Sequence, residues 1–164
     1  MIIMDELIRI AGVVDESIVD GPGIRFVVFT QGCSHNCKGC HNPKTHSYKG
    51  GTLIKVGDII NRMLENPLID GLTISGGEPF DQANTVSILA HCVKKLGYSV
   101  WTYTGYLYED IVKIAKTDLG YKTLLESTDV LVDGEFDETK MDSTLRFKGS
   151  TNQREIQVSE ILHN

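Results

Sequence analysis

Apolar residues follow two patterns along the chain: short continuous runs typical of strands, and longer stretches with helical spacing. The runs, which are rich in β-branched and aromatic residues, are 24–30, 71–75, 98–103 and 129–132. The stretches with helical spacing begin near Asp58, near Asp81, which is a candidate N-cap, and at about Tyr108, and end at Pro67, Gly97 and Gly120. Strands that alternate with helices form βαβ units, so the sequence predicts an α/β fold with a largely parallel sheet.

The length of the chain limits which α/β architecture it can form. A closed eight-stranded β/α barrel takes about 250 residues, whereas this chain has 164. The chain can therefore form a smaller sheet or an incomplete barrel, but not a closed one. No repeat, low-complexity segment or Pro- or Ser-rich linker interrupts the chain, so we expect residues 1–164 to form a single domain. A domain of this size needs no structural metal to fold, and any metal should therefore serve chemistry.

Charge and hydropathy exclude two classes of protein. The formal net charge of -6 argues against a duplex nucleic-acid-binding protein, because such proteins carry clusters of Lys and Arg. No apolar stretch approaches the roughly 20 residues that span a bilayer. Asp5 and Glu6 stand where a signal peptide would carry basic residues. We therefore expect a cytoplasmic protein with neither nucleic-acid nor membrane partners.

Three of the four cysteines form a C-x3-C-x2-C motif, at Cys33, Cys37 and Cys40. In a reducing cytosol, cysteines spaced this closely indicate metal ligands and not disulfides. Three thiolates in one loop can bind a 4Fe-4S cluster, which ordinarily takes four protein sulfurs. The fourth cysteine, Cys92, lies in a helical stretch and is interpreted as a small buried apolar residue. One iron would then stay open to a substrate or cofactor.

The cysteine spacing alone leaves other metal sites open. A zinc site could combine the cysteines with His35 or His41. The segment 37–41 also matches the C-x-x-C-H pattern of c-type haem attachment, but that interpretation leaves Cys33 unexplained and belongs to exported proteins. A ferredoxin-like electron carrier would need a fourth cysteine near the other three.

A second candidate loop, Gly76-Gly77-Glu78-Pro79, directly follows the strand predicted at 71–75. Paired glycines let the backbone approach a ligand closely, and a carboxylate can accept hydrogen bonds from an ammonium or hydroxyl group. The loop that carries the three cysteines follows the strand predicted at 24–30. Residues 104–105 follow the strand at 98–103, and residues 133–135 follow the strand at 129–132. Because the carboxyl ends of parallel strands meet at one edge, we expect all four loops to converge on one site.

Two sets of side chains near these loops have two possible roles each. Trp101, Tyr103 and Tyr106 surround the end of the third strand, where a ring could stack on a heterocycle or a sulfonium, although Trp101 also suits the core. Asp133 could face a cationic ligand or serve the turn before Gly134.

The cysteine motif followed by the Gly-Gly-Glu-Pro loop resembles the radical S-adenosylmethionine (SAM) superfamily. In that superfamily three cysteines hold a 4Fe-4S cluster, the cofactor's amino and carboxylate groups bind the open iron, and the Gly-Gly-Glu loop positions the amino group. The segments DGPGIR (20–25), QGC (31–33) and CHNP (40–43) are similar to the glycyl-radical activating enzymes. The segments WTYTGY (101–106), LVDGEF (131–136) and RFKGSTNQR (146–154) resemble the family that activates anaerobic ribonucleoside-triphosphate reductase.

The resemblance implies an incomplete β/α barrel and a radical SAM oxidoreductase. Reductive cleavage of SAM at a 4Fe-4S cluster would give a 5'-deoxyadenosyl radical that abstracts hydrogen from a glycine of the reductase. The implied metal ligands are Cys33, Cys37 and Cys40, and the implied cofactor contacts are Gly39, Cys40, His41, Gly76, Gly77 and Glu78. The partners would be the reductase and an unidentified electron donor. Gly39 departs from the family, because many superfamily members have an aromatic residue before the third cysteine.

Two other functions stay open. The chain could activate another glycyl-radical enzyme, of the pyruvate formate-lyase type. It could also be a zinc-stabilised binding module without catalysis. The segment 146–154 could contact a partner or form a plain edge strand.

Overall fold

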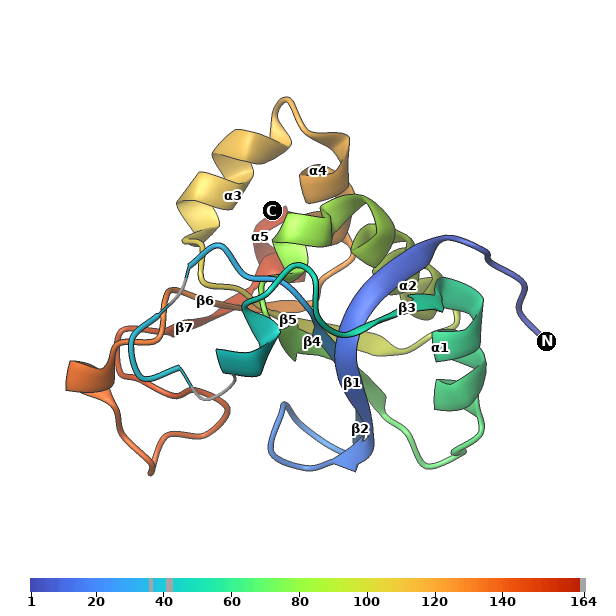
Figure 1. Ribbon diagram of the computed structural model, residues 1–164, viewed down its shortest axis with the longest axis horizontal. Helices are drawn as coiled ribbons and strands as arrows, with labels where there is room; N and C mark the ends of the chain where they lie inside the picture. The colour runs from blue at the N-terminus through green and yellow to red at the C-terminus, as the bar shows by residue number, and fades with distance from the viewer. Residues whose placement is uncertain (36, 41–42, 163–164) are drawn as a thin grey trace.

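The computed structural model describes residues 1–35, 37–40 and 43–162, which form one open seven-stranded sheet with helices (Figure 1). The strands are β1 (Leu7–Ser17), β2 (Arg25–Thr30), β3 (Thr52–Lys55), β4 (Gly71–Gly76), β5 (Ser99–Tyr103), β6 (Val130–Asp133) and β7 (Arg154–Gln157). The α-helices are α1 (Val56–Leu64), α2 (Ala83–Lys95), α3 (Tyr108–Ala115), α4 (Leu119–Glu126) and α5 (Val158–Leu162). Short 3-10 helices are η1 (Pro43–Thr45), η2 (Pro79–Gln82) and η3 (Glu138–Lys140).

The strand order is β3-β1-β2-β4-β5-β6-β7, and its central part is parallel. The pairs β2–β4, β4–β5 and β5–β6 are parallel, whereas β1 pairs antiparallel with β2 and β3, and β7 with β6. The predicted α/β class is confirmed, and the four predicted strands are the four parallel ones. The expectation of a largely parallel sheet holds only for this centre, because both edges are antiparallel.

The parallel strands follow one another in chain order, so each crossover connection moves in the same direction across the sheet. Since such connections are right-handed, their helices belong on one face. Figure 1 shows α2, α3 and α4 together on one side of the strands. On this side the main core joins alternate strand residues, such as Phe26, Leu72 and Ile74, to Val86 and Leu89 of α2.

The opposite face of the sheet, which no α-helix of the described residues covers and which is called the helix-free face below, carries a smaller cluster. Trp101, Val130 and Val132 are buried there, with Tyr103 and Phe147 packed against them. Phe147 comes from the segment 134–153, between β6 and β7, and its ring lies 5.4 Å from that of Trp101 in an edge-to-face contact. A loop therefore covers this face where a helix covers the other.

The third predicted helix is two helices. Asp118 ends the connection after α3 and caps α4, since its side chain accepts a hydrogen bond from the Tyr121 backbone N–H at 3.1 Å. Gly120 lies inside α4 and does not end a helix. A Cβ at Gly120 would lie 2.2 Å from Asn84 Oδ1, so this glycine allows α4 to pack closely on the start of α2.

At the amino ends of the parallel strands, the side chain of Arg25 is buried and joins three strands. Its guanidinium donates to Thr73 Oγ1 at 2.8 Å, Leu72 O at 2.8 Å and Ser99 O at 3.1 Å. Burial lowers the pKa of Arg25 to about 10. The guanidinium also donates to Pro22 O at 3.1 Å, which fixes the segment before β2 against the sheet.

No helix among the described residues has both the length and the apolar character needed to cross a bilayer.

Candidate functional site

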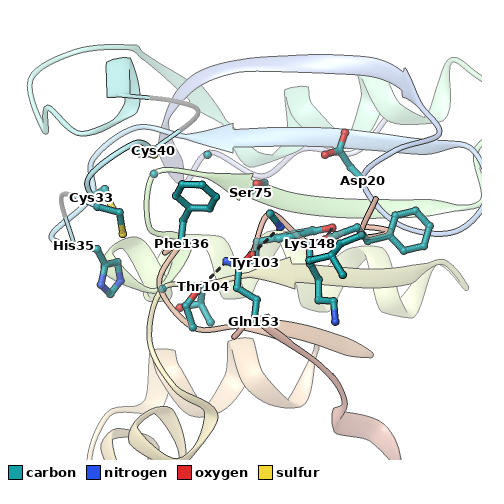
Figure 2. Close-up of a pocket in the computed structure, with 18 of the residues that line it drawn as sticks. Asp20, Cys33, His35, Cys40, Ser75, Tyr103, Thr104, Phe136, Lys148 and Gln153 are labelled. Atoms are coloured by element: carbon teal, nitrogen blue, oxygen red, sulfur yellow. Dashed lines mark hydrogen bonds between the residues drawn. The ribbon is translucent and has the colours of Figure 1, made fainter. Parts of the chain in front are cut away.

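The loops after the four parallel strands surround one cavity of about 360 Å³, a volume in the range of small-molecule sites. Its lining includes residues from each strand end: Cys33, Cys37 and Cys40 after β2, Gly76 at the end of β4 and Gly77 after it, Thr104 and Gly105 after β5, and Gly134 after β6. The predicted convergence of these loops is confirmed. Figure 2 shows that the cavity extends from Cys33 and Cys40 along the helix-free face of the sheet to Asp20.

The three thiols of the cysteine motif are half-buried and all line this cavity. Burial, followed by the negative charge of Glu135, raises the pKa of Cys37 to about 11. The Cys37 thiol donates to Glu135 Oε2 at 3.8 Å. A cluster would have to displace this proton, as metal binding to thiols does in general. Across the described ranges, no three His, Cys, Asp or Glu side chains group closely enough to hold a single ion.

Cys92 lies apart from this motif, on α2. It is half-buried and packs against the main core, and burial raises the pKa of its thiol. Its interpretation as an apolar packing residue is confirmed.

Glu78 is completely buried beneath the cavity and accepts hydrogen bonds on both carboxylate oxygens. Thr104 Oγ1 donates to both at 2.9 Å, and the Gly105 N–H donates to Oε1 at 2.8 Å. The Phe80 N–H donates to Oε2 at 3.0 Å. His35 Nε2 contacts Oε1 at 2.6 Å. Glu78 therefore connects the loops after β2, β4 and β5.

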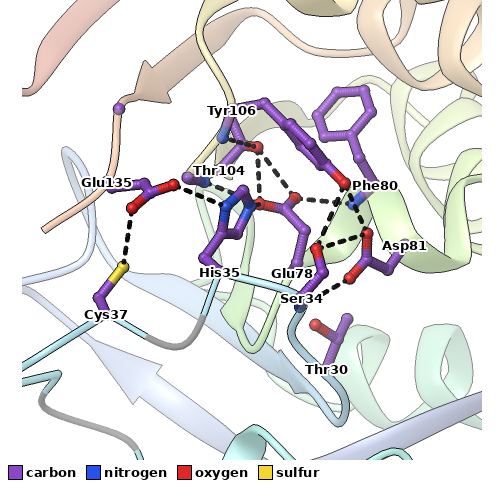
Figure 3. Close-up of polar contacts among 12 residues, drawn as sticks. Thr30, Ser34, His35, Cys37, Glu78, Phe80, Asp81, Thr104, Tyr106 and Glu135 are labelled. Carbon is purple, nitrogen blue, oxygen red and sulfur yellow. Dashed lines mark hydrogen bonds and ion pairs between the residues drawn. The ribbon is translucent and has the colours of Figure 1, made fainter.

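His35 lies between two carboxylates, as Figure 3 shows. Its Nε2 contacts Glu78, its Nδ1 lies 3.3 Å from Glu135 Oε1, and its ring packs edge-on against Tyr106 with the centroids 4.5 Å apart. Burial acts to lower the pKa of His35, but the hydrogen bonds and charges of Glu78 and Glu135 outweigh it and raise the pKa. The two carboxylates thus stabilise the protonated form of His35.

The paired glycines pack against the start of the cysteine loop. Gly77 N–H donates to Thr30 O and Glu78 N–H donates to Gly32 O, each at 2.8 Å. A Cβ at Gly77 would lie 2.3 Å from Gly32 O, and Gly76 has a φ of +98°, which favours glycine. The sequence predicted that these glycines allow a ligand to approach, and the structure adds that they allow the chain's own backbone to approach.

The other predicted cofactor contacts differ in position. Cys40 lines the cavity, whereas Gly39 is exposed, has a φ of +75°, and lies beside Glu138 of η3. His41 lies outside the described residues.

Several lining residues were missed from the sequence. Ser75 lies on β4 at a position that alternates with the core residues Leu72 and Ile74, so strand periodicity could have found it. Tyr103, which the sequence indicated as a stacking residue, faces the same way and donates through its hydroxyl to Phe147 O at 2.7 Å. No local signal shows that the segment 134–153 covers this face. Other missed side chains that line the cavity include Asp20, Phe136, Lys148 and Gln153.

Asp133 does not face the cavity. It is fully buried and accepts hydrogen bonds from Arg154 and, at 2.7 Å, from the Tyr108 N–H. Arg154 also donates to Glu109 at 2.8 and 3.0 Å. Neither role that the sequence left open for Asp133 is the observed one: its carboxylate binds the start of α3 and Arg154, the first residue of the edge strand β7.

Three thiols and a Gly-Gly-Glu loop at one edge of a parallel sheet define a candidate iron–sulfur enzyme, and the comparison with protein families agrees. Residues 19–156 match the family described as a 4Fe-4S single cluster domain. The chain therefore carries a 4Fe-4S domain, and the zinc-stabilised module is no longer needed to explain the cysteines.

Relatives along most of the chain identify the family more narrowly. The anaerobic ribonucleoside-triphosphate reductase-activating protein of Haemophilus influenzae is 34% identical over 149 residues, which cover 83% of this chain and 89% of that protein. The proteins of the same name from Vibrio cholerae and Enterobacteria phage T4 are 36% and 34% identical, and cover 83% of this chain and 89% and 85% of their own lengths. The chain belongs to this family of activating proteins, which are radical SAM enzymes.

Proposed function

We propose that this protein activates an anaerobic ribonucleoside-triphosphate reductase, with Cys33, Cys37 and Cys40 as the ligands of its 4Fe-4S cluster. The observation that carries the proposal is that the three thiols and the paired glycines line one cavity. The relatives' names supply the protein substrate. When bound, the cluster and SAM supply reductive cleavage to methionine and a 5'-deoxyadenosyl radical, which takes a hydrogen atom from a glycine of the reductase.

The cofactor contacts that we propose are Gly39, Cys40, His41, Gly76, Gly77 and Glu78. Gly76, Gly77 and Cys40 line the cavity, which supports their assignment. The carboxylate of Glu78 is surrounded by protein donors, and an ammonium group could reach Oε1 by replacing His35, the donor from the cysteine loop, which contacts it at 2.6 Å. Cofactor binding at Glu78 would therefore move the His35 ring away from this oxygen.

We also propose that the open sheet is an incomplete β/α barrel. Its parallel strands follow chain order, and the cavity lies on the helix-free face, where a barrel would have its interior. The missing strands would leave the cavity accessible from the side. A glycine loop of another protein could then reach the radical without unfolding the activating protein.

No side chain is assigned as a general base, since the chemistry belongs to the cofactor. The chain's residues bind and orient the cofactor and limit the access of water. An electron donor is required as a second partner. We place the reaction in the cytoplasm, where a reducing environment keeps ligand cysteines as thiols.

The test is to reconstitute the protein anaerobically, reduce it, add SAM and measure 5'-deoxyadenosine, with and without the reductase. We expect product that depends on each of Cys33, Cys37 and Cys40, and a glycyl radical detected by electron paramagnetic resonance when the reductase is present. A cluster-loaded protein that produces no 5'-deoxyadenosine in either condition would refute the proposal. A glycyl radical formed only on a formate-lyase-type enzyme would keep the chemistry and change the partner.

A further inference from the structure

The turn that begins at Glu78 contacts the cysteine loop, residues 31–48, at several separate points. Glu78 contacts His35 near the middle of the loop. Gln82 donates to Gln31 O at 3.1 Å at the start of the loop. Asp81, between Glu78 and Gln82, contacts Ser34 near the start of the loop and Tyr48 at its far end. The described part of the loop is thus connected to one short turn, η2 with its cap Glu78, and of these connecting side chains the proposed chemistry uses neither Asp81 nor Gln82.

Asp81 accepts hydrogen bonds from three residues, shown in Figure 3 for Ser34 and Tyr106. The Ser34 N–H donates to Oδ2 at 3.1 Å, and the Ser34 hydroxyl lies 3.4 Å from Oδ1. Tyr48 donates to Oδ2 at 2.7 Å, and Tyr106 to Oδ1 at 3.0 Å. Ser34 directly follows Cys33, Tyr48 ends the loop, and Tyr106 follows β5.

The sequence predicted a different role for Asp81, that of the N-cap of the helix that ends at Gly97. That prediction is wrong, because Pro79 begins a 3-10 turn and the carboxylate of Glu78 caps it through the Phe80 N–H. Gln82 precedes α2 without a side-chain cap. Asp81 is therefore directed to the cysteine loop, and it does not line the cavity.

We propose that Asp81 is a positioning residue that fixes the cysteine loop before the cluster binds. A carboxylate that accepts hydrogen bonds from both ends of a loop reduces the conformations available to it, so the ordering entropy is lost during folding and not when the cluster binds. Asp81 thus acts through Ser34 on Cys33, and it touches neither thiol nor cofactor. The part of this inference that concerns the cluster depends on the proposed function.

The first experiment uses the metal-free protein and needs no cluster. In Asp81→Ala, we expect backbone amides at 31–48 to exchange hydrogen, and the thiols at Cys33 and Cys37 to react with a thiol reagent, about tenfold faster than in the wild type, because hydrogen bonds to a charged group are lost. The matched control is Asp118→Ala, which removes a half-buried capping aspartate of α4 at a similar cost in stability. Equal acceleration in both variants would overturn the proposal.

Asp81→Asn separates hydrogen bonding from charge. Its amide oxygen can accept from the Ser34 N–H, and its NH₂ group can donate to the Tyr106 hydroxyl oxygen, so the network survives without the charge. We expect exchange rates within about threefold of the wild type, since most hydrogen bonds remain. If Asp81→Asn were as impaired as Asp81→Ala, charge and not positioning would explain the effect. Should Asp81→Ala fail to fold, Tyr48→Phe and Tyr106→Phe remove one donor each, and both should accelerate exchange.

The second experiment measures iron and acid-labile sulfide after anaerobic reconstitution, and the rate of iron loss to a chelator. We expect Asp81→Ala to lose iron about tenfold faster, and Asp81→Asn and Asp118→Ala to behave like the wild type. Wild-type rates for Asp81→Ala would overturn the role toward the cluster. A wild-type protein that binds no iron, but shows the expected exchange pattern, would refute the proposed function and leave the positioning of the loop standing.

Discussion

Replacing Gly77 with alanine tests how closely the glycine loop packs against the cysteine loop. The added Cβ would lie 2.3 Å from Gly32 O, 2.8 Å from Gly32 C and 2.9 Å from Thr45 O, all of them backbone atoms. An ordinary contact needs 3.4 Å or more, so the two loops would have to separate by about 1 Å. Rotation of a flexible side chain cannot relieve this clash.

The expected cost follows from two contributions. Forcing an extra methyl group into a packed site costs about 1–3 kcal/mol. The displacement also stretches the hydrogen bond from Glu78 N–H to Gly32 O, which is 2.8 Å long and contributes about 1 kcal/mol. Together these give about 2–4 kcal/mol, which for a domain of this size lowers Tm by roughly 5–15 °C.

The measurement is thermal unfolding of the metal-free protein by circular dichroism. Gly12→Ala is the matched control, because a Cβ at Gly12 has no atom within 4 Å and the substitution changes the backbone entropy in the same way. We expect Gly12→Ala to leave Tm nearly unchanged. If Gly77→Ala also unfolded within about 2 °C of the wild type, a range that corresponds to 1 kcal/mol or less, the inferred packing of the two loops would be incorrect.

Three further predictions concern the cluster ligands, the ion pair of buried Asp133 with Arg154, and acid stability. Alanine variants of Cys33, Cys37 and Cys40 should each lose the iron and sulfide that Cys92→Ala retains, as measured by metal analysis. Arg154→Met should lower the free energy of unfolding by about 1–3 kcal/mol in urea titrations, because the buried carboxylate of Asp133 loses its charged partner. The hydrogen bond from Arg154 lowers the pKa of Glu109 to about 2, so ionised Glu109 stabilises the fold fully above about pH 4.5 and loses this effect as the pH falls through 2. The difference in unfolding free energy between the wild type and Glu109→Gln should follow this pH dependence; a pH-independent difference would contradict the prediction.

The parallel strands could be predicted because their residues are buried on both faces. β6 is buried at every position, and β2 at all but one, so each appears in the sequence as a continuous apolar run. β7 has the sequence Arg-Glu-Ile-Gln and exposes three of its four residues, so its position depends on pairing with β6 and not on a local pattern. Edge strands of this kind give no such signal.

The candidate site likewise has one part that could be predicted from the sequence and one part that could not. The three thiols could be predicted because their spacing is local, and the convergence of loops follows from the parallel strands. The hydrogen-bond partners of Glu78 could not be predicted, because Thr104 and His35 lie 26 and 43 positions away along the chain. The sequence suggested a carboxylate that faces a ligand, whereas the fold surrounds this carboxylate with donors from two other loops. Long-range contacts decide what a side chain at a recognised motif can reach.

The order of the parallel strands also explains why the cavity lies on one side of the sheet. Because every crossover moves the same way, α2, α3 and α4 cover one face, and the core that stabilises the fold lies beneath them. The other face is then left to the segment 134–153, whose side chains line the cavity along with Ser75 and Tyr103. Adjacent residues of one strand therefore serve different tasks: Ile74 packs in the core, and Ser75 faces the cavity. A strand sequence here is constrained by stability at one position and by the cavity's chemistry at the next.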